Sequence, residues 1–313
     1  MAPDVAHLVR SASAVLDAAG IASARTDAEL LRAHAAGVSR NDVVTAALLG
    51  RSLDGPGVED AFAALVGRRA GREPLQHLVG RAPFRHLELE VGPGVFVPRP
   101  ETETVAQLAV DEAREVLSRT GSVLVVDLCT GSGAIALAVA TEVPGSRVHA
   151  VELDVAAFAW AQRNVASLLG DQGPAPRLTL VRGDARRALA ALDGTCDVVV
   201  SNPPYVPPGA VPKDPEVAEH DPAVALYGLG ADGLEVPRGI AAAAARLLRP
   251  GGLFVMEHAE VQAASARAMV DELDAFDPAT TVADLGGRPR TVVARRSGTV
   301  RVAGAETMGD SAS

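Results

Sequence analysis

Apolar residues recur at helical spacing along residues 1–80. They stand three or four positions apart in "VAHLVRSASAVLDAAGI" (5–21) and "DAELLRAHAAGV" (27–38), and "EDAFAALVGRRAGREPLQHLVG" (59–80) continues the pattern up to a glycine. Such spacing places the apolar side chains on one face of each helix, and that face must be buried against a neighbour. We therefore expect a small helical domain over residues 1–80.

The pattern changes over residues 81–98. In "FRHLELEVGPGVFVPRP" (84–100), apolar and polar residues alternate on either side of Gly-Pro-Gly, which is typical of two short strands joined by a turn. We expect a β-hairpin there that links the helical domain to the rest of the chain.

From Glu101 onward, apolar runs of strand length alternate with helical segments. The runs expected to form strands are "SVLVVDL" (122–128), "RVHAVEL" (147–153), "LTLVRGD" (178–184), "CDVVVSN" (196–202) and "GGLFVMEHA" (251–259), followed by a closing pair in "TTVADLGGRPRTVVARR" (280–296). Repeated strand–helix units predict an α/β fold in which a mainly parallel sheet carries helices on both faces. We assign this domain to residues 99–296.

Two segments outside these elements have distinct compositions. Residues 207–239 are rich in Pro, Gly and Asp and directly follow the fourth strand, and a loop of this length inside a compact domain is usually functional. We expect this loop to gate a substrate site. The small and polar tail, residues 297–313, is expected to be disordered.

Composition narrows the classes of function. The 313-residue chain is 48% hydrophobic, and its formal net charge of -10 with a pI near 5.2 opposes a broad phosphate-binding surface. It has no apolar core of signal-peptide type and no apolar stretch near the ~18 residues of a membrane span, so we expect a cytoplasmic protein without a membrane partner. Its two cysteines, Cys129 and Cys196, are expected to be free thiols, and no histidine or cysteine spacing indicates a metal.

"VVDLCTGSGAIAL" (125–137) reads as a strand, a glycine turn and a helix. This arrangement lets backbone N–H groups approach a bound cofactor closely. A dinucleotide fingerprint would have a third glycine three positions beyond Gly133, where this chain has Ala136, a variant that the fingerprint also admits. Asp127, directly before the turn, would repel a pyrophosphate but suits S-adenosylmethionine (SAM), which carries an ammonium group and a sulfonium.

Two further acidic residues end the next two strands. Glu152 lies about 20 residues beyond the glycine turn, where an acidic side chain can accept both ribose hydroxyls; Asp154 is a nearby competitor. Asp184 ends the third strand and could accept from the adenine amino group. Three acidic residues at the ends of consecutive strands, beside a glycine turn, favour a SAM-dependent methyltransferase.

"VVVSNPPYVPP" (198–208) ends the fourth strand in stiff, polar residues. Pro203 and Pro204 lock φ and lack N–H donors, which leaves carbonyl groups and the Asn202 side chain as acceptors. Two acceptors, the Asn202 side-chain oxygen and the Pro203 carbonyl oxygen, can hold both hydrogens of a planar NH2 group and turn its lone pair toward a methyl donor. Tyr205 would stack on the flat substrate group.

The same motifs carry a resemblance to a known family. "NPPY" with the glycine turn resembles the amino methyltransferases, and "REPLQHLVGRAPFRHLELEVGPGVFVPRPETE" (72–103) resembles more narrowly the release factor glutamine methyltransferase family (HemK/PrmC). The resemblance covers the chain up to the tail. It implies a seven-stranded, Rossmann-like class I SAM-dependent methyltransferase domain behind a substrate-binding helical domain. It also implies methylation of N5 of the glutamine in the Gly-Gly-Gln loop of class 1 peptide chain release factors.

Site residues follow from the residue analysis and this resemblance together. The catalytic residues expected are Asn202, Pro203, Pro204 and Tyr205. Those expected around the cofactor are Asp127, Cys129, Thr130, Gly131, Ser132, Gly133, Glu152, Asp184, Ala185 and Asn202. Arg99 and Glu103, in "PRPETE", are expected near substrate or cofactor, with Asn202, Pro203 and Tyr205 on the substrate. Two residues depart from the family: Cys129 replaces its usual glycine, and Ala185 replaces a larger side chain near adenine.

Three other functions remain open at this point. An adenine-directed DNA or RNA methyltransferase would use the same grip on an NH2 group, although the acidic composition and the lack of a basic or aromatic module oppose it. A ribosomal-protein glutamine methyltransferase would differ only in its N-terminal surface. A protein that binds SAM without transferring the methyl group would have no need of the complete "NPPY" motif.

Overall fold

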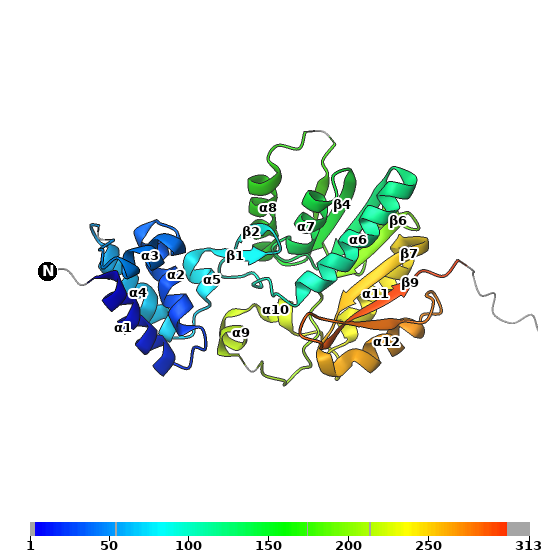
Figure 1. Cartoon of the computed structure of the whole chain (residues 1–313). Coiled ribbons are helices and arrows are strands. Elements are labelled where there is room, and N and C mark those ends of the chain that lie inside the picture. The colour runs from blue at the N-terminus through cyan, green and yellow to red at the C-terminus, as the bar shows by residue number, and fades with distance from the viewer. Residues whose placement is uncertain (1–3, 54, 174, 213, 299–313) are drawn as a thin grey trace, which may run out of the picture. The chain divides into compact units, whose positions relative to one another are not determined.

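The computed structural model describes residues 4–53, 55–173, 175–212 and 214–298. Its contacts divide the chain into two compact units (Figure 1). The helical unit comprises residues 1–83, 87–98 and 210–222. The second unit comprises residues 84–86, 99–209 and 223–313, and we call it the catalytic unit because it carries the residues expected to be catalytic. Most of the tail that we expect to be disordered, residues 299–313, lies outside the described residues.

Five helices form the N-terminal part of the helical unit, as the apolar spacing predicts. They are α1 (Val5–Ala18), α2 (Ala24–Ala36), α3 (Arg40–Leu48), α4 (Val58–Ala70) and α5 (Leu75–Val79). The α1 positions Val5, Val9, Ala12 and Leu16 share one buried face, at the spacing expected of an amphipathic helix. Helix α3 begins with a capping box, in which Ser39 and Asp42 satisfy each other's backbone N–H groups.

The expected hairpin consists of two four-residue strands, β1 (Arg81–Phe84) and β2 (Leu87–Glu90). Their exposed and buried residues alternate strictly, as in strands with one face against a core. The turn between them contains Arg85 at a φ of 55°.

Helix α9 (Pro215–His220) also belongs to the helical unit, although it lies in the segment that we expect to be one long loop. Glu216 accepts hydrogen bonds from Arg69 Nη1 at 2.8 Å and from Arg72 Nη2 at 2.6 Å. Arg69 is buried and also donates to Asp27 at 2.8 Å. The buried carboxylate of Asp27 and the partly buried carboxylate of Glu216 therefore flank one buried guanidinium, and this cluster fixes the segment on the helical unit.

The catalytic unit contains a seven-stranded sheet in the order β5-β4-β3-β6-β7-β9-β8. Its strands are β3 (Val123–Leu128), β4 (Ser146–Glu152), β5 (Leu178–Arg182), β6 (Cys196–Ser201), β7 (Leu248–Glu257), β8 (Thr280–Ala283) and β9 (Pro289–Arg295). Strands β5, β4, β3, β6 and β7 are parallel, and β9 pairs antiparallel with β7 and β8. The expected α/β fold with seven strands is confirmed.

Helices cover both faces of this sheet. They are α6 (Thr102–Thr120), α7 (Ala134–Glu142), α8 (Val155–Leu169), α11 (Glu235–Leu247) and α12 (Ala263–Asp271). The unit also contains the four-residue helix α10 (Ala223–Leu226) and short 3-10 turns at Ala190–Leu192 and Glu260–Gln262. Helix α6 packs with α7 and α7 with α8, whereas α11 packs with α12 against side chains such as Phe254 and Met256. None of the described helices is long and apolar enough to cross a membrane.

The Glu216 cluster gives a testable consequence. In Glu216→Gln the buried Arg69 loses a charged partner, so we expect the free energy of unfolding to fall by about 1–3 kcal/mol. Amide hydrogens of α9 should exchange faster, as measured by hydrogen–deuterium exchange with mass spectrometry. The control Glu219→Gln makes the same charge change at an exposed position of the same helix and should alter neither property. Equal rates of amide hydrogen exchange in α9 of the two variants would show that Glu216 does not hold this helix in place.

Candidate active site

Asp127 lies at the end of β3 and organises the glycine turn. Its Oδ2 accepts from Thr130 Oγ1 at 2.6 Å and from Ala136 N at 3.1 Å, which ties the turn to the first residues of α7. Its Oδ1 is buried and has no hydrogen-bond partner among the described residues. Burial raises the pKa of Asp127 to about 7, and the hydrogen bonds only partly oppose this rise. A cation near Oδ1 would therefore stabilise the ionised form.

Backbone conformation explains the glycines of this turn. Gly131 and Gly133 have φ values of 58° and 88°, which favour glycine. A Cβ at Gly133 would lie 3.3 Å from Leu137 Cδ1 and 3.8 Å from Ala161 Cβ, so this glycine also allows close packing of α7 and α8. At Gly131 a Cβ would meet nothing within 4 Å, so only its backbone angle favours glycine.

Cys129 also adopts a left-handed backbone, with a φ of 65°. Glycine has no steric penalty in this conformation, which is consistent with the glycine that the resemblance implies at this position. Burial raises the pKa of the Cys129 thiol, so it stays protonated. Cys129 and Cys196 are both free, as expected. Among the residues that the structure describes, no group of three or more His, Cys, Asp or Glu side chains could hold a metal ion.

Glu152 ends β4 beside the same turn. Its Oε2 accepts from Gly131 N at 2.8 Å and its Oε1 accepts from Asp154 N at 2.8 Å. Its pKa is raised by burial, against the effect of these backbone donors. The competitor, Asp154, is occupied as the N-cap of α8, where Oδ1 accepts from the N–H groups of Ala156 and Ala157. Glu152 is thus the acidic group that reaches back to the glycine turn.

Asp184 follows β5 at the same sheet edge, but its carboxylate is already engaged. Arg186 donates to both oxygens from its side chain, at 2.7 to 3.1 Å, and to Oδ1 from its backbone at 3.0 Å. These bonds hold the pKa of Asp184 below its usual value. The neighbouring Ala185 is buried in the apolar core formed with α11. Ser132 lies in the turn itself, where its carbonyl oxygen accepts from Asn164 Nδ2 at 3.0 Å.

Asn202 follows β6 and begins a chain of hydrogen bonds that leads to the buried side chain of Glu257. Its Nδ2 donates to Thr102 Oγ1 at 3.1 Å, and Thr102 Oγ1 donates to Glu257 Oε2 at 2.7 Å. Tyr205 OH donates to the other carboxylate oxygen, Oε1, at 3.2 Å. Within the described residues, no hydrogen bond reaches Asn202 Oδ1 or the Pro203 carbonyl oxygen. Both remain available as acceptors.

Thr102 and Glu257 are the two residues in this chain that the sequence analysis missed. Thr102 lies between the two acidic residues of "PETE" (100–103), and its hydroxyl contacts Asn202. Glu257 is the last residue of β7. A signal for Glu257 existed, because it too lies at the carboxyl end of a parallel strand. Glu103, expected at the substrate, instead accepts from Arg85 N at 2.8 Å at the tip of the hairpin. Arg99 is half-buried, and its carbonyl accepts from Thr102 N at 3.1 Å.

Backbone packing supports the chain from Asn202 to Tyr205 from behind. A Cβ at Gly228 would lie 1.8 Å from the Gly233 carbonyl oxygen and 2.7 Å from the Pro204 carbonyl oxygen. A Cβ at Gly233 would lie 2.5 Å from the Tyr205 carbonyl oxygen, which also accepts from Gln262 Nε2 at 2.9 Å. Neither glycine can therefore be replaced without moving the backbone of this motif.

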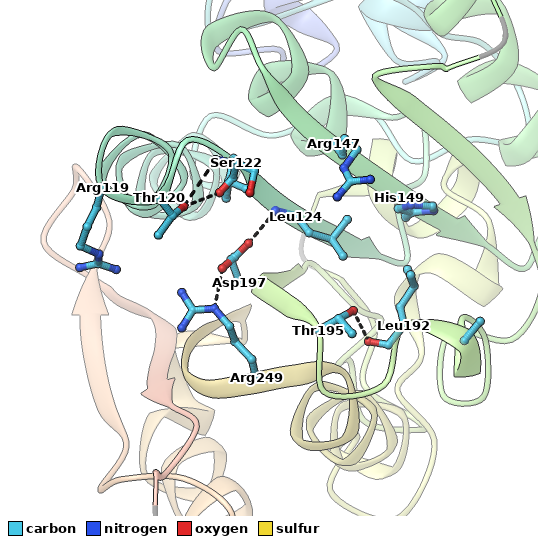
Figure 2. Close-up of a pocket in the computed structure, with 12 residues that line it drawn as sticks. Arg119, Thr120, Ser122, Leu124, Arg147, His149, Leu192, Thr195, Asp197 and Arg249 are labelled. Atoms are coloured by element: carbon cyan, nitrogen blue, oxygen red, sulfur yellow. Dashed lines mark hydrogen bonds and ion pairs between the residues drawn. The ribbon is translucent and has the colours of Figure 1, made fainter.

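A pocket of about 540 Å³ lies at the opposite edge of the sheet, near the amino ends of β3, β4 and β6 (Figure 2). Its lining includes Arg119, Arg147, His149 and Arg249. Asp197, on the wall that Figure 2 shows, accepts from Leu124 N at 2.7 Å and from Arg249 Nε at 2.6 Å. The pocket contains none of the expected site residues. Ligands of parallel α/β sheets bind at the carboxyl ends of the strands. The candidate site is therefore the edge with Asp127, Glu152 and Asn202.

Comparison with known proteins agrees with this geometry. Residues 7–80 match the model of the PrmC N-terminal domain, and residues 93–217 match that of the methyltransferase small domain. A release factor glutamine methyltransferase of Bifidobacterium longum is 45% identical over 93% of this chain and 99% of its own length. One of Streptomyces coelicolor is 46% identical over 92% and 97%, respectively. The chain belongs to the release factor glutamine methyltransferase family.

Another relative of similar closeness has a different name. The 4-amino-L-phenylalanine/4-methylamino-L-phenylalanine methyltransferase of Streptomyces pristinaespiralis is 42% identical over 86% of this chain and 87% of its own length. All three names describe methyltransferases. This chain is accordingly an enzyme of the class I SAM-dependent methyltransferase fold, with SAM as its cofactor.

The residues at this sheet edge fit SAM. The unpaired and buried Asp127 Oδ1 is an acceptor suited to its ammonium group, and Glu152 beside Gly131 is suited to its ribose hydroxyls. A pyrophosphate would meet two buried carboxylates here and be repelled.

The raised pKa of Asp127 predicts pH-dependent cofactor binding. A cation binds the ionised carboxylate more tightly, and this form is lost as the pH falls through about 7. We therefore expect SAM to bind about tenfold more weakly at pH 6 than at pH 8, as measured by titration calorimetry. Asp127→Asn should bind more weakly at pH 8 and lose this dependence, whereas Asp184→Asn should keep it. If SAM binding still depends on pH in Asp127→Asn, this dependence belongs to another group, such as Glu152.

The close backbone packing at Gly228 predicts a loss of activity on substitution. Gly228→Ala must displace the Gly233 or Pro204 carbonyl, so we expect stability to fall by about 1–3 kcal/mol and methyl transfer to slow at least about tenfold. The control Gly67→Ala lies within α4, where a Cβ meets nothing within 4 Å, and should raise stability by up to about 1 kcal/mol with an unchanged rate. Thermal unfolding and methyl transfer from labelled SAM measure both. A normal rate in Gly228→Ala would show that the motif tolerates the shift.

Proposed function

We propose that this enzyme methylates N5 of the glutamine side chain in the Gly-Gly-Gln loop of class 1 peptide chain release factors. The observation that carries the proposal is the pair of unpaired acceptors, Asn202 Oδ1 and the Pro203 carbonyl oxygen, at the carboxyl end of β6. The names of relatives that match over nearly the whole chain support this substrate. We place the reaction in the cytoplasm.

An amide nitrogen is a weak nucleophile because its lone pair is delocalised into the carbonyl group. Two acceptors that bind its two hydrogens orient the NH2 group and raise the electron density on nitrogen. SAM, when bound, supplies a methyl carbon on a sulfonium, whose sulfur keeps the electron pair of the broken bond. The nitrogen becomes acidic as its new bond to carbon forms, so it loses one proton to solvent and needs no strong base.

In this proposal the aromatic ring of Tyr205 contacts the flat substrate group. Its hydroxyl is held by Glu257, which orients the ring at the edge of the site. Burial raises the pKa of Tyr205, so the hydroxyl keeps its proton and cannot act as a base at neutral pH. Tyr205 therefore supports binding of the substrate and takes no part in proton transfer.

The partner in this proposal is a folded protein. The helical unit, with the segment that Glu216 holds on it, provides a surface outside the catalytic unit for such a partner. Contacts far from the reacting amide would supply the energy that orients it, so free glutamine should react poorly. The formal net charge of -10 opposes direct binding to nucleic acid.

The deciding experiment is methyl transfer from labelled SAM to a purified release factor, with mass spectrometry to locate the methyl group. We expect label on the Gly-Gly-Gln glutamine, reduced at least about 100-fold by Asn202→Ala even at saturating SAM. Glu115→Ala, at an exposed position of α6 outside the helical unit, is the control and should react normally.

Parallel reactions contain duplex and single-stranded DNA, RNA, ribosomal proteins and 4-amino-L-phenylalanine. Label on any of these, with none on the release factor, would overturn the proposed substrate while leaving the methyltransferase assignment intact.

A further inference from the structure

Asn202 can serve as an acceptor only if its amide is held the right way round. The side-chain oxygen and nitrogen of asparagine have nearly the same shape but opposite hydrogen-bonding roles. If Nδ2 faced the substrate, two NH2 groups would point at each other and neither would have an acceptor. Some feature of the structure must therefore fix the direction of this amide.

The chain of hydrogen bonds behind Asn202 has one consistent direction. An ionised Glu257 only accepts, so the single hydroxyl proton of Thr102 is donated to Glu257 Oε2 at 2.7 Å. Thr102 Oγ1 then has only lone pairs left for Asn202, and it accepts from Nδ2 at 3.1 Å. Because Nδ2 is bound there, Oδ1 lies on the other side of the amide. The ionised state of Glu257 thus fixes the hydroxyl proton of Thr102, and this proton in turn fixes the orientation of the Asn202 amide.

We propose that Glu257 and Thr102 are positioning residues that hold the Asn202 amide with its oxygen toward the substrate NH2 group. The inference rests on the proposed function in one respect, which is that Asn202 Oδ1 accepts from the substrate. Tyr205 OH, on Glu257 Oε1 at 3.2 Å, shares the same anchor, so one carboxylate orients both side chains of the motif. Glu257 is 3% exposed and Thr102 is 5% exposed, so the hydrogen bond between these two residues is buried from water.

The surroundings of Glu257 determine when this direction holds. Burial raises its pKa to about 7, while the hydrogen bonds from Thr102 and Tyr205 and the charge of Arg290 act against the rise and Glu101 adds to it. Arg290, on β9, forms an ion pair with Asp284, with 3.4 Å between Nε and Oδ2. His258 follows Glu257 in the chain, and burial lowers its pKa. Once protonated, the Glu257 carboxyl group can donate to Thr102, and the chain loses its fixed direction.

Substitutions at Thr102 test the relay without changing a charge. Thr102→Val keeps the shape but removes both hydrogen bonds, and we expect the single-turnover rate at saturating SAM and release factor to fall about tenfold to hundredfold. Thr102→Ser restores the hydroxyl and should react within about threefold of the wild type. SAM affinity should be unchanged in both variants. Equal rates in Thr102→Val and the wild type would overturn the proposal.

Substitution of Glu257 tests the role of charge through the pH profile. In the wild type the single-turnover rate should rise with pH through about 7, as Glu257 ionises. Glu257→Gln should be about tenfold slower at pH 8 and should lack this rise. The control Glu112→Gln removes another buried carboxylate of the same unit, which pairs with Arg295 at 2.6 Å, and should keep the normal profile even if its melting temperature falls.

A measurement without substrate separates this inference from the proposed function. The side-chain amide signals of Asn202, assigned by their loss in Asn202→Ala, can be followed by ¹⁵N NMR on the deuterated full chain between pH 6 and 8. They should shift with a midpoint near 7 in the wild type and stay constant in Glu257→Gln. Signals that do not move in the wild type, or move equally in both, would overturn the relay whatever substrate the enzyme methylates. If the NMR signals behave as expected but the release factor is not labelled, only the proposed function is contradicted.

Discussion

Burial of three carboxylates at one edge of a parallel sheet is the constraint on which the rest of the site depends. Asp127, Glu152 and Glu257 end three strands of the sheet and are each less than a tenth exposed. Desolvation raises the pKa of all three, so each carboxylate exists as an anion only where donors compensate it. Left-handed backbone turns and hydroxyl groups provide those donors, which explains why rigid turns and threonines surround the site.

The two halves of the site solve different chemical problems. On the cofactor side, the ligand is a cation, so Asp127 and Glu152 present formal negative charge to it. On the other side, the proposed ligand is a neutral amide, and Asn202 offers a neutral oxygen. A carboxylate at position 202 would stand beside Thr102 and Glu257, and the repulsion would keep one of the two acids protonated. A neutral acceptor avoids this conflict, but only if its amide is held in one orientation.

The sequence patterns predict most of this framework, because strand edges and glycine turns follow from local periodicity. Asp127, Glu152, Asp184 and Asn202 could be placed at one sheet edge, since the carboxyl ends of parallel strands meet there. The hydrogen bond from Asn202 to Thr102 spans 100 residues and that from Thr102 to Glu257 spans 155, and no local pattern encodes such contacts.

The sequence also does not predict which side chains and backbone groups contact one another at the site. Asp184 occupies the expected place at the sheet edge, yet its carboxylate is engaged by Arg186 two residues later. Gly228 lies in the segment expected to be a loop that gates a substrate site, and the sequence does not predict its packing against a carbonyl of the motif. Both features depend on atomic distances between backbone and side chains, and residue type and spacing do not determine these.

The long segment after the motif is closed at its base. Val206 N donates to the Leu226 carbonyl at 2.8 Å, and Gly228 N donates to the Val206 carbonyl at 3.1 Å, so both ends of residues 207–227 are held together in the catalytic unit. Its middle, around Glu216, is held separately by arginines of the helical unit. The backbone bonds at the base hold the residues next to Pro203 independently of the ion pairs around Glu216. Catalysis by positioning requires acceptors that stay fixed in this way.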